Sequence, residues 1–246
     1  GVNTKMLQVA AQVFALPAKM ITVNSTNTFR IANTSPSAAS ATADLKGKAG
    51  LIACNAIRER SQKVAGDILQ VSANEVNFED GKVVVKNSAA SLTWKELIAS
   101  AYVKRVSLSE HGHYATPDIH FDPAKEKGHP FAYHVYGTAI TEVTVDCIRG
   151  TYEIDAVKVV HDIGRSMNPV VDRGQIEGGI VQGIGWMTME EIVYDKEGKL
   201  RSNALSTYKV PDIYSVPKEL TIINHESATD NLAIFNSKAV GEPPLM

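Results

Sequence analysis

Apolar residues recur along the chain at two spacings, and these spacings predict a mixture of helices and strands. Helical spacing, or an alanine-rich composition, predicts helices over residues 3–16, 38–64, 93–104 and 168–191. Alternation of apolar and polar residues, which places every second side chain on one face, predicts strands within residues 20–24, 76–85, 131–164, 192–200 and 220–226.

Turn and capping residues define the boundaries of several of these elements. Asp80-Gly81 stands between two alternating runs and predicts a tight β-hairpin. Thr93 followed by Glu96 is the pattern of a capping box, which indicates a helix start. Asp172 is the candidate N-cap of the last predicted helix.

The order of the predicted elements favours an α+β fold. Helices and hairpins follow one another without the regular alternation of strand and helix that builds a parallel sheet. A linker-like stretch that contains Pro117, Pro123 and Pro130 interrupts the pattern. We therefore expect two α+β lobes, residues 1–125 and 126–246, with mixed, mainly antiparallel sheets and packed helices.

Composition narrows the possible classes of function. Hydrophobic residues make up 44% of the 246 residues, which is enough for a sizeable core. The formal net charge of −2 argues against partners such as nucleic acid or an acidic membrane, and no apolar run approaches the roughly 20 residues that span a bilayer. Cys54 and Cys147 lie far apart, which argues against a disulfide framework, an iron–sulfur cluster or a structural zinc and predicts a cytoplasmic location.

The predicted helix at 172–189 is rich in glycine, which costs about 1 kcal/mol per residue relative to alanine inside a helix. Its glycines are Gly174, Gly178, Gly179, Gly183 and Gly185. Something must therefore approach this backbone closely. One interpretation is tight packing against another element. The other is a bulky cofactor that lies on the glycine face and takes hydrogen bonds from Gln175 and Gln182.

Glu242 precedes two prolines, Pro243 and Pro244, which restrict the backbone and fix the direction of the carboxylate. A carboxylate with a fixed direction suits a general base, and a solvated acid in a proline-rich segment is the alternative. His161-Asp162, at the end of a predicted strand, also has two interpretations. It is either a proton relay or a packed, hydrogen-bonded histidine.

Four motifs in this order resemble one known family. They are NTSPSAASATADLKGKA at 33–49, RSMNPVVDRGQIEGG at 165–179 with its continuation IVQGIGW, STYKVP at 206–211, and SKAVGEPPL at 237–245. Together they resemble the molybdenum-binding subunit or domain of the xanthine dehydrogenase and aldehyde oxidase family, and most closely that of xanthine dehydrogenases. The resemblance runs through essentially the whole chain.

The resemblance implies roles for individual residues. Glu242 matches the family's active-site glutamate, the base that activates the oxygen nucleophile. Gln175 matches a residue that hydrogen-bonds to the cofactor beside the metal. Ala39 matches a position whose backbone lies against molybdenum, and Ala38 matches its neighbour on the substrate side. The residues that match contacts to the pterin are Ser40, Ala41, Thr42 and Ala43.

For the whole protein, the resemblance implies a molybdenum hydroxylase that oxidises hypoxanthine or xanthine to urate, with water as the source of oxygen. Molybdenum–molybdopterin would bind here, while 2Fe-2S, FAD and NAD would bind on other domains or subunits. The full assembly would be a homodimer, with this chain as roughly the C-terminal half of its molybdenum domain. An aldehyde oxidase of the same family and a non-catalytic remnant are the alternatives.

Overall fold

The chain forms two compact units, Gly1–Asp118 and Ile119–Met246. The computed structural model describes residues 1–24, 26–29, 39–226, 230 and 232–245. Both units combine helices with small sheets in which most strand pairs are antiparallel, so the predicted α+β class is confirmed. Among the described residues, no helix combines the length and the apolar character that crossing a membrane requires.

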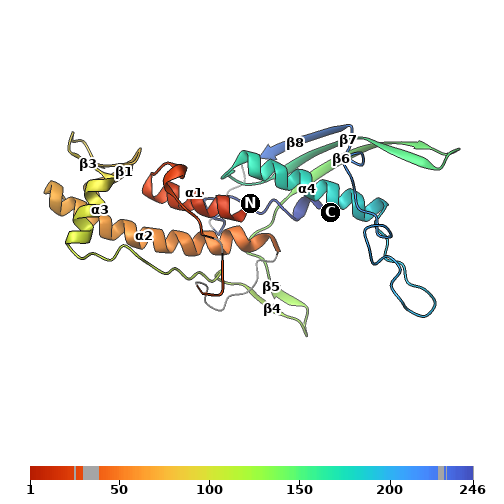
Figure 1. Ribbon diagram of the computed structural model, residues 1–246, viewed down its shortest axis with the longest axis horizontal. Coiled ribbons are helices and arrows are strands. Elements are labelled where there is room, and N and C mark those ends of the chain that lie inside the picture. Colours follow the sequence, from red (N-terminus) through yellow and green to blue (C-terminus); the bar gives the residue numbers. More distant parts are fainter. Residues whose placement is uncertain (25, 30–38, 227–229, 231, 246) are drawn as a thin grey trace. The chain divides into compact units, whose positions relative to one another are not determined.

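The first unit is built around one long helix, α2, which packs against two shorter helices and the first strand of an antiparallel sheet (Figure 1). The strand order in this sheet is β1-β2-β3. The helices are α1 (Val2–Phe14), α2 (Thr42–Leu69) and α3 (Trp94–Val103), the strands are β1 (Val76–Glu79), β2 (Lys82–Val85) and β3 (Ser91–Thr93), and the short 3₁₀ helices are η1 (Ala18–Met20), η2 (Ala39–Ala41) and η3 (Ala73–Glu75).

Local sequence rules account for the turns of this unit. Asp80 and Gly81 both have positive φ, 46° and 74°, as a two-residue hairpin turn requires. Thr93 accepts a hydrogen bond from the backbone N–H of Glu96 at 3.2 Å, and the Glu96 carboxylate accepts one from the backbone N–H of Thr93 at 2.8 Å. The predicted hairpin and capping box are thus both confirmed.

The core of the first unit lies between α2, α3 and the β1–β2 hairpin. Val64, Phe78 and Leu97 are buried there. The Trp94 ring meets Phe14 and Phe78 edge to face, with ring centroids 5.5 Å apart in each pair. Burial of these aromatic rings joins the sheet and the helices into one packed unit.

The second unit holds a three-stranded sheet that α4 covers on one face (Figure 1). Strand β7 is central, with β6 antiparallel on one side and β8 parallel on the other. The elements are β4 (His120–Asp122), β5 (Lys127–His129), β6 (Gly137–Asp146), β7 (Thr151–Asp162), α4 (Pro169–Thr188), β8 (Glu219–His225) and the 3₁₀ helix η4 (Pro243–Leu245).

The N-cap of α4 differs from the prediction. Asn168, rather than Asp172, is the N-cap, and its side-chain oxygen accepts a hydrogen bond from the backbone N–H of Val171 at 3.1 Å. Asp172 lies fully buried in the first turn, where it accepts a hydrogen bond from the Ser166 hydroxyl at 2.7 Å. Pro169 occupies the first turn, a position where its missing N–H costs nothing.

Two predicted strands do not form as expected. Residues 20–24 contain the end of η1 and then irregular backbone, and their alternation finds no neighbouring strand among the described residues. A short strand without a partner lacks the cross-strand hydrogen bonds and packing that stabilise extended backbone. The hairpin predicted over 192–200 forms only as a short one, with an antiparallel bridge between Tyr194 and Leu200 and a backbone hydrogen bond from Asp195 N–H to the carbonyl oxygen of Lys199 at 3.0 Å.

The core of the second unit joins the sheet, α4 and the C-terminal part of the chain. Val157 and Val159 of β7 pack against Ile176 and Ile180 of α4, and Val240 belongs to the same cluster with 5% of its surface exposed. The packing of Val240 therefore holds the segment that follows β8 against α4.

Candidate functional site

The segment that carries Glu242, residues 237–245, is anchored by its backbone to the chain just beyond β7. Phe235 and Asn236, which precede it, both adopt positive φ, at 49° and 63°. These values are uncommon for residues other than glycine and indicate a backbone that its surroundings constrain. The backbone N–H of Lys238 then donates a hydrogen bond to the carbonyl oxygen of Ile163 at 2.9 Å.

Glycines of α4 leave room for the later part of this segment. A Cβ atom at Gly179 would lie 2.9 Å from the carbonyl oxygen of Gly241, and a Cβ atom at Gly183 would overlap the carbonyl oxygen of Leu245. Real Cβ atoms essentially never come this close to another heavy atom, so neither position has room for a side chain. Tight packing against another element is therefore the correct interpretation for Gly179 and Gly183.

The backbone on both sides of Glu242 is fixed. On the N-terminal side, Val240 is buried in the core of the unit. On the C-terminal side, the backbone N–H of Leu245 donates a hydrogen bond to the carbonyl oxygen of Glu242 at 2.9 Å and closes a turn through the two prolines of η4. The Glu242 residue itself is exposed, so its side chain projects from a rigid support.

Gln175 lies one helical turn before Gly179, on the same side of α4. The carbonyl oxygen of Gly241, the residue before Glu242, packs on Gly179, one turn after Gln175, and both Gln175 and Glu242 are exposed. A Cβ atom at Gly174 or Gly178 would meet no described atom within 4 Å. The helix backbone beside Gln175 is thus open within this unit.

A buried ion pair supports the start of the same segment. The Nζ atom of Lys238 lies 2.7 Å from Oδ2 of Asp162, and the two residues are 7% and 4% exposed. Lys238 Nζ also donates a hydrogen bond to the carbonyl oxygen of His134 at 3.2 Å. Sequence reasoning missed Lys238, and its one indication in the sequence is a lysine within a run of small and apolar residues.

His161 is packed beside this ion pair, with 3% of its surface exposed. Burial lowers the pKa of His161, while a hydrogen bond with the backbone of Ala239 and the charge of Asp162 act in the opposite direction. This environment favours the interpretation of His161 as a packed, hydrogen-bonded histidine over that of a proton relay.

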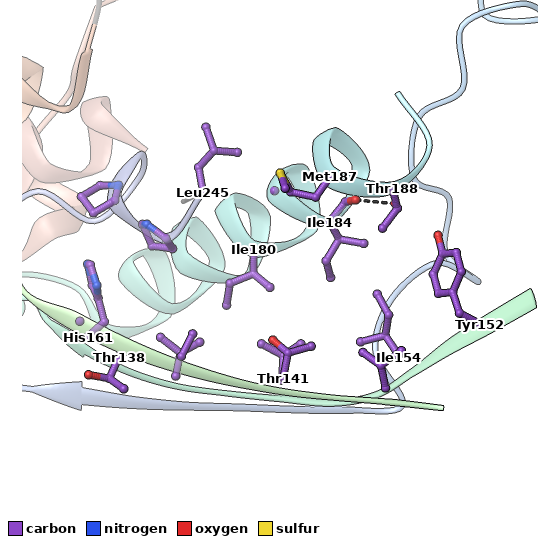
Figure 2. Close-up of a pocket in the computed structure, with 18 of the residues that line it drawn as sticks. Thr138, Thr141, Tyr152, Ile154, His161, Ile180, Ile184, Met187, Thr188 and Leu245 are labelled. Atoms are coloured by element: carbon purple, nitrogen blue, oxygen red, sulfur yellow. Dashed lines mark hydrogen bonds between the residues drawn. The ribbon is translucent and has the colours of Figure 1, made fainter. Parts of the chain in front are cut away.

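An apolar cavity of about 810 Å³ lies between α4 and the strands β6 and β7 (Figure 2). Figure 2 shows Ile180 and Ile184 of α4 facing Thr141 and Ile154 of the sheet across this space. Its lining includes η4 but not Glu242. The cavity therefore borders the backbone that follows the carboxylate rather than the carboxylate itself.

The other predicted cofactor contacts lie at the start of α2, in the first unit. Ala39, Ser40 and Ala41 form η2, and α2 continues with Thr42 and Ala43. Ala41 is the N-cap of α2, and its side chain offers no capping hydrogen bond. Backbone N–H groups at such a helix start suit an anionic group. Ala38 lies outside the described residues.

Comparison with family models identifies the family. The model of the molybdopterin cofactor-binding domain matches residues 1–217. The chain belongs to this family. The resemblance found in the sequence motifs is therefore confirmed, and so is molybdopterin as the cofactor of the domain.

Relatives of this family cover the whole chain. Xanthine dehydrogenase/oxidase of Mus musculus is 39% identical over 245 residues, which is 100% of this chain and 17% of the relative. The chain thus spans about a sixth of the length of the curated relatives that it matches.

Two solved structures share the fold. Quinoline 2-oxidoreductase from Pseudomonas putida 86 matches with a TM-score of 0.82 and 26% identity, over 100% of this chain and 30% of that chain. Aldehyde oxidoreductase from Desulfovibrio desulfuricans matches with a TM-score of 0.76 and 24% identity, over 98% of this chain and 23% of that chain. Both matches support the architecture of a molybdopterin cofactor-binding domain.

The residues present in each unit fit a molybdopterin. The exposed amide of Gln175 offers both a donor and an acceptor to a polar ring, and the open backbone at Gly174 and Gly178 leaves space for a bulky group. In the first unit, the start of α2 offers N–H groups that suit an anionic or polar part of the cofactor. Gly179 and Gly183 therefore serve packing, while the cofactor interpretation stays a prediction for Gly174 and Gly178.

Proposed function

We propose that this chain is part of the catalytic domain of a molybdenum hydroxylase that oxidises a purine, hypoxanthine or xanthine, to urate. The observation that supports the proposal is that the backbone beside Glu242 packs on Gly179 of α4, one helical turn after Gln175. The identity of 39% with a mouse xanthine dehydrogenase/oxidase over the full chain supports the choice of a purine as substrate.

In this proposal Glu242 is the general base. A base must lie within about 3 Å of the proton that it accepts, so its support must be rigid. The core residue Val240 and the turn closed by Leu245 supply that support on either side. The Glu242 carboxylate accepts the proton of the water-derived oxygen that attacks an electron-poor carbon of the purine.

The remaining residues bind and orient the cofactor. When bound, the molybdenum cofactor supplies the two-electron oxidation that accompanies transfer of oxygen from water to the substrate. Gln175 would hold the cofactor by hydrogen bonds, and the backbone of Ala39 would border the metal. The pterin is bound by Ser40, Ala41, Thr42 and Ala43, with Ala38 on the substrate side. Support for these roles comes from the exposure of Gln175 and from the position of Ala39–Ala41 at the N-terminal end of α2.

The proposal includes the rest of the assembly, because the chain spans only 17% of its mouse relative. Electrons leave through 2Fe-2S and FAD, bound by other domains or subunits, to NAD. The whole enzyme is a homodimer in the cytoplasm. An aldehyde oxidase is the second candidate, since the fold is shared with an aldehyde oxidoreductase. A non-catalytic remnant is the third.

Turnover in ¹⁸O-labelled water tests the proposal. The full enzyme that contains this chain, made in a host that supplies molybdopterin, is assayed with xanthine, hypoxanthine and an aromatic aldehyde. We expect label in urate and a kcat/KM for the purines at least about tenfold above that for the aldehyde, a difference of about 1.4 kcal/mol in transition-state free energy. A higher kcat/KM for the aldehyde would make the aldehyde the substrate in place of the purine. Molybdenum-loaded protein that oxidises neither compound would favour the non-catalytic remnant.

A further inference from the structure

The charges of Lys238 and Asp162 are almost completely removed from solvent. Their side chains lie 2.7 Å apart, with 7% and 4% of each residue exposed. Burial of a charge is unfavourable unless a partner of opposite charge and further hydrogen bonds compensate for it. Such compensation is present, because Lys238 also donates to the carbonyl of His134 and Asp162 accepts from the backbone N–H of Gly164 at 3.0 Å.

These interactions hold the start of the segment that ends at Glu242. The backbone N–H of Ala239, the next residue, donates a hydrogen bond to the Tyr133 hydroxyl at 3.0 Å. The Lys238 ammonium group lies 5.9 Å from the centroid of the same Tyr133 ring, a cation–π distance. Side chain and backbone of residues 238–239 are thus both fixed, three residues before Glu242.

The two residues between Ala239 and Glu242 are also held by packing. Val240 is buried in the core formed with α4, and the carbonyl oxygen of Gly241 packs on Gly179. A shift of Lys238 would therefore pass to the Glu242 backbone through a run of packed residues. Interiors packed in this way transmit small displacements rather than absorb them.

We propose that Lys238, through its buried ion pair with Asp162, is a positioning residue for Glu242. The inference rests on the proposed role of Glu242 as the general base. Lys238 touches neither proton nor substrate, and it acts by fixing the backbone from which the carboxylate projects. Loss of the ion pair should therefore slow the proton-transfer step and leave substrate affinity unchanged. A misplacement of about 1 Å is enough to slow catalysis about 100-fold.

The test uses the full enzyme and removes both charges together. In the double variant Asp162→Asn/Lys238→Met, the Asn oxygen can still accept from Gly164, and Met keeps the apolar length of Lys. No lone charge stays buried, so this variant avoids the folding defect that Lys238→Met alone invites. The matched control is Lys218→Met, which breaks an exposed ion-pair network with Glu153 and Asp155 in the same unit.

We expect the double variant to lose about 10- to 100-fold in kcat, with KM within about twofold of wild type and molybdenum content unchanged. In a Glu242→Gln background the same double substitution is expected to change kcat by less than about twofold, because the group that it positions is already gone. The control Lys218→Met is expected to keep the wild-type kcat.

If Glu242→Gln is slow, three results would overturn the inference alone. The first is a wild-type kcat in the double variant. The second is that the double substitution lowers kcat as much in the Glu242→Gln background as in the wild-type background, and the third is that Lys218→Met lowers kcat as much as the double substitution does. A rate per bound molybdenum that stays at the wild-type value would also overturn it, because the pair would then serve folding or cofactor loading only. A wild-type kcat in Glu242→Gln would overturn the proposed function together with this inference.

Discussion

Protonation of His161 is unfavourable in the folded chain because the side chain is buried, and its pKa is lowered accordingly. In the unfolded chain a histidine titrates near a pKa of about 6.5. Below that pH the unfolded chain binds the proton more readily than the folded chain does. The stability that neutral His161 contributes is therefore complete above about pH 6.5 and is lost as the pH falls toward the lowered folded pKa.

This linkage predicts a pH dependence that one substitution removes. Between pH 7.5 and 5.5, the free energy of unfolding of the protein is expected to fall, and His161→Met, which cannot take up the proton, is expected to fall less. Urea unfolding of both proteins at the two pH values measures the difference. Equal decreases in the two proteins would show that His161 does not contribute to this dependence.

Single residues differ in how far sequence alone reveals them. Two prolines and several glycines single out Glu242 and Gln175 in the sequence, while their roles come from the family resemblance and stay predictions. The Asp162–Lys238 ion pair could not be predicted, because its members are 76 residues apart and meet only after the chain beyond β8 returns to the end of β7. A contact of that kind is a property of the tertiary fold.

At the scale of elements, α4 is the surface against which residues 237–245, the segment that carries Glu242, pack. Its glycines at 179 and 183 admit backbone atoms of residues 241–245 where a methyl group would collide. This arrangement explains why a helix retains residues that each cost about 1 kcal/mol relative to alanine. The close packing of the two backbones holds the segment that carries Glu242 against the helix.

Gly183→Ala is accordingly expected to slow the enzyme about 10- to 100-fold, since the added methyl group displaces Leu245 and with it the turn at Glu242. The matched control is Gly50→Ala in α2, a helical glycine whose Cβ would meet no described atom within 4 Å. Steady-state kcat per bound molybdenum compares the two. A loss in both variants, or in neither, would contradict the role of this contact.

Elements with strong local rules could be predicted from sequence, and those that depend on partners could not. The hairpin at Asp80-Gly81 and the capping box at Thr93 form as expected because a few neighbouring residues determine them. The strand expected over 20–24 does not form, since a strand also needs a neighbour with which to pair. The N-cap of α4 is Asn168 rather than Asp172, because the Asp172 carboxylate is buried and accepts a hydrogen bond from the Ser166 hydroxyl instead.

At the scale of the whole molecule, the chain is two α+β units of a molybdopterin cofactor-binding domain. The predicted cofactor contacts are divided between them, with residues 39–43 in the first unit and Gln175 and Glu242 in the second. The class of fold and the cofactor could be predicted because four sequence motifs resemble one family. Substrate choice could not, since the chain spans about a sixth of its curated relatives.

The central claim is that Glu242 is the base of this enzyme, and Glu242→Gln tests it most directly. Gln keeps the size and polarity of the side chain but cannot accept the proton. Glu197→Gln, in an exposed turn of the same unit, is the control. With molybdenum content measured in each protein, we predict that kcat falls about 100- to 10,000-fold in Glu242→Gln and is unchanged in Glu197→Gln. Wild-type turnover by a fully loaded Glu242→Gln enzyme would contradict the account.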